Sequence, residues 1–148
     1  MPDSRTLTLS AVLDTIIPPS ADGRLPGAGA AGLAGYLEEA VRRTPDLGPV
    51  LEQGLAALDA RAGERGAEDF ASLDPAVRAE LLGSLSSEQP GFLPLLGFHV
   101  YAGYYQDPVV ARALGTRPAP FPDGYEVEPN DLSLLDPVRQ RAPLYRDA

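Results

Sequence analysis

The sequence contains no cysteine, no lysine and no tryptophan, and only one histidine among its 148 residues. The absence of cysteine excludes disulfide bonds, thiolate metal sites and a cysteine nucleophile. The single histidine, His99, has no acidic residue among the seven positions before it, so the usual helical spacing of metal ligands is missing. No G-x-S-x-G turn occurs, and no G-x-G-x-x-G opens a strand–helix–strand unit. We therefore expect no catalytic residue, no metal and no cofactor in this chain.

Basic charge is also scarce, since 12 arginines face 21 acidic residues and the net charge is -9. Nucleic acids and anionic membrane surfaces both attract basic patches, so neither is expected as a partner. No run of about 18 apolar residues is present. The N-terminal residues lack an apolar segment followed by a cleavage site, which predicts a cytoplasmic location.

Apolar residues recur at helical spacing through most of the chain, and no segment alternates as a strand would. The stripes predict helices near residues 9–17, 33–41, 47–58, 75–85, 90–106 and 108–114. Prolines or glycines follow most of them, and Asp46, Asp74 and Asp107 are placed to cap the helices that begin after them. The predicted fold is all-α, a single helical bundle of about five or six helices. The helix over 90–106 is apolar nearly all round, which predicts a central, buried position.

The last 33 residues differ in composition and pattern, because six of them are proline and the helical periodicity of apolar residues disappears. The exception is a short helical turn predicted after Asp136-Pro137. We divide the chain into a bundle domain, residues 1–115, and an extended proline-rich C-terminal arm, residues 116–148. Phe121, Tyr125 and several leucines keep the arm apolar, so it is expected to pack either on its own bundle or on a partner.

The residues Gly103–Pro108, with the sequence GYYQDP, end the most apolar helix. Adjacent tyrosines on a helix project about 100° apart, so one of Tyr104 and Tyr105 can enter the core while the other faces outward. Asp107 would cap the next helix and turn the chain. Tyrosine is favoured at protein interfaces because it offers a large area and a polar hydroxyl. The candidate partner-binding residues are Tyr104, Tyr105, Asp107, Phe121 and Tyr125, although both tyrosines and the arm could instead cover their own bundle.

Several short motifs occur in a fixed order along the chain. They are TIIPP at 15–19, DG at 22–23 with PGA at 26–28, GYYQDP at 103–108, ALG at 113–115 and PFPDGY at 120–125. In this order and separation the series resembles the gluconate 2-dehydrogenase subunit 3 family, over roughly Leu9 to Tyr125.

The resemblance implies a non-catalytic small subunit of a heteromeric FAD-dependent oxidoreductase acting on sugars, polyols or related alcohols. Its partner would be a larger subunit of the glucose–methanol–choline (GMC) oxidoreductase type. That larger chain would hold the FAD and the catalytic base, and the small subunit would support its folding and stability. Such small subunits often accompany an exported partner, but the N-terminal sequence here favours a cytoplasmic complex.

Two other functions fit the residues themselves. The chain could be a self-sufficient helical scaffold or binding module, for example a homodimer, with no flavoprotein partner. It could also be a small enzyme that uses His99 as a general base with tyrosines as proton donors.

Overall fold

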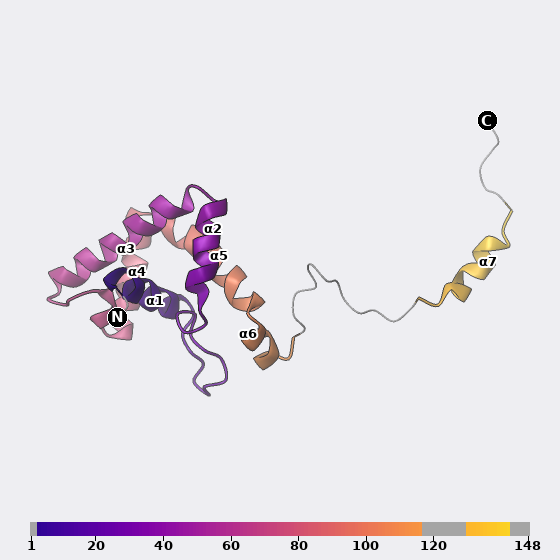
Figure 1. Ribbon diagram of the computed structural model, residues 1–148, viewed down its shortest axis with the longest axis horizontal. Helices are drawn as coiled ribbons and strands as arrows, with labels where there is room; N and C mark the ends of the chain where they lie inside the picture. Colours follow the sequence, from indigo (N-terminus) through magenta and orange to yellow (C-terminus); the bar gives the residue numbers. More distant parts are fainter. Residues whose placement is uncertain (1–2, 117–129, 143–148) are drawn as a thin grey trace. The chain divides into compact units, whose positions relative to one another are not determined.

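A computed structural model describes residues 3–116 and 130–142, and every regular element in these two ranges is a helix (Figure 1). The all-α prediction is therefore confirmed. The chain divides into two units, residues 1–118 and 119–148, and each is described on its own. The assignment of residues 1–115 and 116–148 as separate domains stays a prediction.

The first unit holds six α-helices, in line with the predicted number, and one short 3-10 helix, η1. They are α1 (Ser4–Ile16), α2 (Leu33–Arg43), α3 (Leu47–Glu64), η1 (Phe70–Ser72), α4 (Pro75–Glu88), α5 (Phe92–Gln106) and α6 (Pro108–Ala113). The helix α5 packs beside α2 and also contacts α3 and α1. The short helix α6 continues from the end of α5 after a turn (Figure 1).

The helix boundaries follow from capping residues and prolines. Asp3 caps α1 by accepting a hydrogen bond from the Thr6 N–H at 2.9 Å, and Pro18-Pro19 prevents the helix from continuing. Asp46 and Asp74 precede α3 and α4 as predicted, but neither side chain accepts a capping hydrogen bond. Both residues therefore hold the predicted N-cap position, and Pro75 follows Asp74 at the start of α4 as predicted, but neither carboxylate binds the first turn. Asp46 already has helical backbone angles, which do not present its carboxylate to the first turn.

The core of the first unit is formed by the predicted apolar stripes. Its largest fully buried side chains are Tyr104, Phe70, Phe92, Leu13, Leu37, Leu47, Leu58, Leu85, Leu96, Val12, Val100 and Val110. One polar contact fixes η1 in this core, because the Asp59 carboxylate accepts hydrogen bonds from the Thr8 hydroxyl at 2.7 Å and the Phe70 N–H at 3.0 Å. This contact joins α1, α3 and η1 and satisfies a buried backbone donor.

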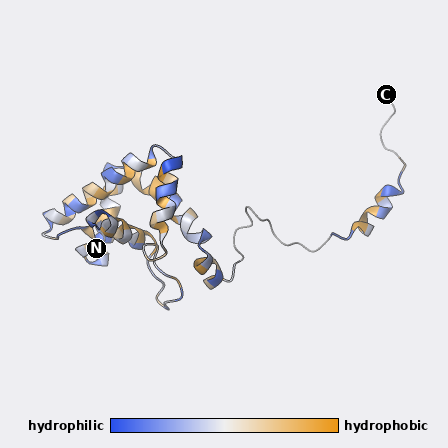
Figure 2. Cartoon of the chain, viewed as in Figure 1, coloured by the Kyte–Doolittle hydropathy of each residue, from blue (hydrophilic) through white to orange (hydrophobic). Residues whose placement is uncertain are grey.

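The described part of the second unit consists of a 3-10 helix, η2 (Leu132–Leu135), and α7 (Asp136–Arg139). The helical turn predicted after Asp136-Pro137 is therefore confirmed. Neither element has a buried residue, and Leu132, Leu134, Leu135 and Val138 are exposed. Figure 2 shows that hydrophobic and hydrophilic residues both occur in this helical segment.

Among the described residues, no helix combines the length and the apolar character needed to span a bilayer. The cytoplasmic location expected from the N-terminal sequence stays a prediction. Two of the five candidate partner-binding residues, Phe121 and Tyr125, lie outside the described residues.

Candidate functional site

The helix α5 buries one face and exposes another, so the central, buried position predicted for this apolar helix holds for one of its faces only. Phe92, Leu96, Val100 and Tyr104 point into the core. On the opposite face Phe98 is 68% exposed, Tyr101 50% and Tyr105 54%. The neighbouring helices α1, α2 and α3 cover only part of the α5 surface. An almost wholly apolar helix therefore meets solvent with aromatic side chains, an arrangement that often marks an interaction site.

Tyr104 and Tyr105 differ as the sequence predicts, although the sequence could not say which of them is buried. Tyr104 is 1% exposed, and its hydroxyl donates a hydrogen bond of 2.6 Å to the carbonyl oxygen of Pro26. Burial raises the pKa of the Tyr104 hydroxyl above its usual value, and the nearby Tyr105 and Asp107 raise it further. The group is therefore held as a neutral donor. Tyr104 can support an interface but cannot touch a partner directly.

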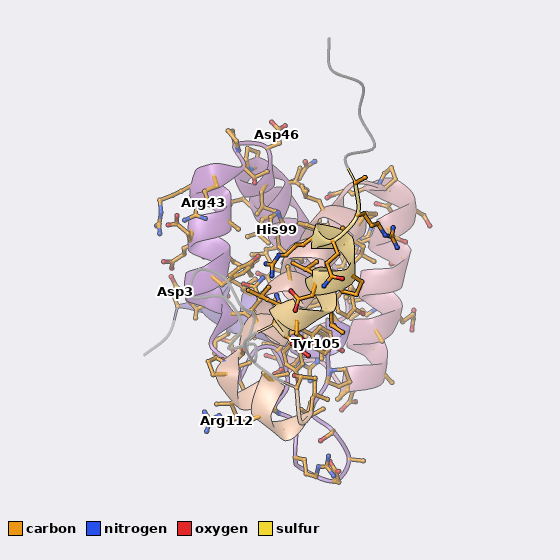
Figure 3. All side chains as sticks on the ribbon, turned by 90° about the vertical axis from the view of Figure 1, so that its right-hand side faces the viewer. Asp3, Arg43, Asp46, His99, Tyr105 and Arg112 are labelled. Atoms are coloured by element: carbon orange, nitrogen blue, oxygen red, sulfur yellow. The ribbon has the colours of Figure 1, made fainter. Side chains whose placement is uncertain are left out.

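Asp107 performs its predicted role as the cap of α6. Its carboxylate accepts hydrogen bonds from the N–H groups of Val109 at 2.8 Å and Val110 at 3.1 Å. Pro108 follows at the first helical position, where a missing N–H costs nothing. The turn places Val110 in the core and leaves Val109 exposed. Asp107 thus fixes the direction of the chain after α5. Tyr105, just before this turn, and Arg112, on α6 after it, are labelled in Figure 3.

The loop between α1 and α2 brings the sequence motifs together. The Ala28 N–H donates to the carbonyl oxygen of Ile17 at 2.9 Å, and the Gly29 N–H donates to the Asp14 carboxylate at 2.8 Å. The Tyr104 hydroxyl binds the same loop at Pro26. Gly103 allows α2 to approach α5, because a Cβ there would lie 2.7 Å from the Tyr36 ring. The TIIPP, PGA and GYYQDP motifs therefore stabilise one corner of the bundle.

The segment 27–32 of this loop reads GAGAAG and comes directly before α2, which invites comparison with a dinucleotide-binding turn. Such a turn follows a strand, and α1 precedes this loop instead. The space beside Gly27 and Gly29 is filled by the Asp14 side chain and, at Gly29, by Ser10. The Gly29 N–H already donates its hydrogen bond to the Asp14 carboxylate, and the negative charge of this carboxylate would repel a phosphate. These glycines allow close packing against α1 and do not fit a nucleotide.

His99 lies on the side of α5 that faces α2 and is only 9% exposed. It borders a pocket of about 160 Å³ lined also by Tyr36, Glu39, Ala40, Arg43 and Thr44. Figure 3 shows the positions of His99 and Arg43. The Glu39 carboxylate is already paired with Arg42 and Arg43, and the His99 Nδ1 atom has no hydrogen-bond partner among the described residues. Within residues 3–116 and 130–142, no carboxylate forms a hydrogen bond with the His99 ring, so nothing in these ranges orients it in the way a general base is usually oriented.

We call the exposed side chains Phe98, Tyr101 and Tyr105 the aromatic strip. The Tyr101 and Tyr105 rings stack with centroids 6.3 Å apart and planes 6° apart, so the strip presents an ordered surface. No charged residue occurs from Gln89 to Gln106, and the strip is therefore uncharged along its length. Depletion of charge and enrichment in aromatic residues distinguish the centre of a protein interface from other surface.

Sequence reasoning missed Phe98 and Tyr101. Phe98 and Tyr101 are three residues apart, and Tyr101 and Tyr105 are four apart. This spacing, which is visible in the sequence, places all three on one helical face. The spacing does not show that this face is exposed, because the opposite face is equally apolar. Of the predicted residues, the structure brings Tyr104, Tyr105 and Asp107 together at the junction of α5 and α6.

Within residues 3–116 and 130–142, no group of three or more histidines or acidic residues is placed to hold a metal ion. Comparisons with curated proteins and with solved structures gave no match. A comparison with protein families matches residues 3–122 of the 148 to the family described as Gluconate 2-dehydrogenase subunit 3. This match spans all of α1 to α6 and includes the TIIPP, DG, PGA, GYYQDP and ALG motifs in full, together with the first three residues of PFPDGY. The chain therefore belongs to the gluconate 2-dehydrogenase subunit 3 family.

Proposed function

We propose that this chain is a non-catalytic accessory subunit that binds and stabilises the larger, FAD-dependent subunit of an oxidoreductase acting on sugars, polyols or related alcohols. The family to which the chain belongs consists of subunits, so an assembly with another chain is its natural context. The observation that carries the proposal is the uncharged aromatic strip of α5. It supplies a surface on which a partner chain can bury apolar area.

The strip is suited to form the centre of an interface. Tyrosine and phenylalanine offer large areas with few rotatable bonds, so little conformational entropy is lost when they are covered. A half-exposed aromatic side chain leaves roughly 100 Å² open, and three of them leave roughly 300 Å². A stable interface covers about 800 Å² on each partner. The strip therefore needs surrounding contacts, and the predicted interface residues Phe121 and Tyr125 are candidates for them.

We assign the FAD and the catalytic base to the partner, a larger subunit of the GMC oxidoreductase type. A dinucleotide-binding turn requires a strand before it, and the elements of the described residues are helical. The GAGAAG segment, which comes closest in sequence, is packed against Asp14 and Ser10. The contribution of this chain would be to shield apolar surface of the partner and so stabilise its folded state.

A homodimeric scaffold is the second candidate, because the same strip could pack against a copy of itself. Each copy has a net charge of -9, however, and bringing two such chains together opposes association. A partner of a different sequence need not carry a like charge, so it need not meet this repulsion.

Co-expression with a candidate large flavoprotein subunit, sought first among the genes that adjoin the gene of this chain, tests the proposal. We expect the two chains to elute together on size exclusion at micromolar concentration, with FAD absorbance in the complex and none in the small chain alone. The thermal melting temperature of the flavoprotein should rise when the small chain is present. Separation of the chains at micromolar concentration would contradict the proposal. A stable dimer of the small chain alone that binds no flavoprotein would favour the scaffold.

A further inference from the structure

The spacing of exposed side chains on α5 indicates what kind of element covers them. Pro94, Phe98, Tyr101 and Tyr105 are separated by four, three and four residues, and all are exposed. Side chains at this spacing line one narrow stripe along a helix. The stripe rises about 16 Å from Pro94 to Tyr105, since each helical residue adds about 1.5 Å. It is thus as long as three turns of a second helix lying alongside it.

A stripe with alternating spacings of four and three is the pattern by which one helix packs against another. The side chains at such positions fit between those of a facing helix that crosses at about 20°. An extended strand would instead need an exposed backbone edge to pair with, and α5 satisfies its own backbone groups within the helix. A facing helix needs only apolar side chains, which this uncharged stripe can accept.

The surface beside the stripe also favours a helix. Gly97 and Ala102 are half-buried small residues next to the aromatic side chains, and a Cβ at Gly97 would meet no atom within 4 Å. Beyond the end of α5, Val109 on α6 is exposed and extends the apolar surface. Ridges of large side chains beside open positions are the features that interlocking helices use.

We propose that an α-helix of the larger subunit lies along the stripe Pro94–Phe98–Tyr101–Tyr105 and inserts its side chains between these residues. The inference rests on the proposed function, since the facing helix belongs to the partner of that complex. A second copy of this chain could supply the same helix, but the like charge of two copies opposes that pairing. The described α-helix of the C-terminal arm, α7, has four residues, about 6 Å, and is too short to cover a stripe of this length. The occupant is therefore a helix of a different chain with an apolar stripe of its own.

Site-specific photocrosslinking tests the inference. The photoreactive phenylalanine analogue p-benzoylphenylalanine is placed singly at Phe98, Tyr101 or Tyr105, and as a control at Gln53, an exposed position on α3. Each variant is co-expressed with the neighbouring flavoprotein, the complex is purified and irradiated, and the crosslinked residues are identified by mass spectrometry. We expect the three strip positions to crosslink to residues three or four apart on one helix of the larger subunit, and Gln53 not to crosslink to that helix.

The outcomes separate the inference from the proposed function. If the complex forms but the crosslinks fall on alternate residues of an extended segment, on a loop, on the C-terminal arm of this chain, or on a second copy of it, the facing helix is overturned and the accessory function stands. If the complex forms and none of the three strip positions crosslinks to the larger subunit, the facing helix is likewise overturned and the accessory function stands. If the wild-type chains form no complex, the proposed function fails together with the inference.

A binding measurement provides a second readout. Tyr101→Ala should raise the dissociation constant of the complex by at least about 30-fold if the ring fills the interface centre. Gln53→Ala should leave it unchanged. The melting temperature of each free variant shows whether the bundle is intact, because an exposed ring contributes little to folding. Unaltered binding by Tyr101→Ala, with the bundle intact, would overturn the inference.

Discussion

The two faces of α5 are built from similar residues and have opposite roles. Tyr104 and Tyr105 are adjacent, yet Tyr104 is enclosed by the bundle with its hydroxyl bound to Pro26, while Tyr105 stands in solvent stacked on Tyr101. The buried face is held by packing, the cap at Asp107 and the close approach at Gly103. The outward rings contact neighbouring rings of α5 but stay at least half exposed among the described residues, so burial within the described bundle does not explain them.

This difference separates residues that fold the chain from residues that are available to a partner. A surface helix of a protein that acts alone usually carries polar side chains outward. Here the outward positions are aromatic over about two turns, from Phe98 to Tyr105, and no charged residue lies in this helix. We therefore expect substitutions on the buried face to change the free energy of unfolding, and substitutions on the exposed face to change binding to the partner.

The largest effect is expected from Tyr104→Ala on the buried face. Removing a buried aromatic side chain costs about 3–5 kcal/mol of unfolding free energy, and here the carbonyl of Pro26 also loses its donor. Urea unfolding followed by circular dichroism measures the loss. Tyr105→Ala is the matched control and should change the unfolding free energy by less than about 0.5 kcal/mol. Equal losses for the two variants would show that the faces do not differ as described.

The next largest effect concerns binding. Tyr105→Ala should weaken the complex with the larger subunit by about 2 kcal/mol or more, because a ring at the centre of an interface loses its contacts there. Isothermal titration or a biosensor experiment with the purified flavoprotein measures the dissociation constant. Tyr105→Phe keeps the ring and should bind nearly as well as the wild type. If the alanine variant bound with unchanged affinity, the outward face would have no interface role.

Gly54 and Gly97 compare a closely packed position with an open one within the bundle. A Cβ at Gly54 in α3 would overlap the buried Phe92 ring, so Gly54→Ala should destabilise the chain by about 1–3 kcal/mol through overpacking. Gly97 lies inside α5 with no atom within 4 Å of a Cβ, and Gly97→Ala should stabilise the helix by about 0.5–1 kcal/mol. Thermal melting of both variants checks the prediction. A similar change for both would mean that the space at these positions is not as the structure shows.

Much of the bundle could be predicted from the sequence because its helices carry clear stop signals. Pro18-Pro19, Pro45 and the Asp107-Pro108 pair define boundaries that the structure reproduces. Side-chain capping was less predictable. The carboxylates of Asp107 and Asp3 accept capping bonds, whereas that of Asp46 does not, because capping depends on backbone angles that residue type alone does not fix.

The candidate site was only partly predictable. The sequence indicated that Tyr104 and Tyr105 face different ways, but the orientation of α5 depends on which neighbours cover it. Since both faces are apolar, hydrophobic periodicity carries no information about burial there, and Phe98 and Tyr101 were overlooked. The Asp14–Gly29 contact was equally hidden, because it joins a helix to a loop through a single hydrogen bond. Phe121 and Tyr125 remain predictions from the sequence.

An effect of about the size expected for Gly97→Ala is predicted at the junction of α5 and α6. Asp107→Ala removes the side-chain acceptor of the Val109 and Val110 N–H groups and should cost about 1 kcal/mol of unfolding free energy. Asp107→Asn keeps an acceptor oxygen and should recover most of that loss. The measurement is again urea unfolding, paired with the dissociation constant of the complex. Because the cap sets the direction of α6, the alanine variant should also weaken binding, but less than Tyr105→Ala does. Weaker binding by Asp107→Ala than by Tyr105→Ala would place the interface on α6 and beyond it rather than on the aromatic strip.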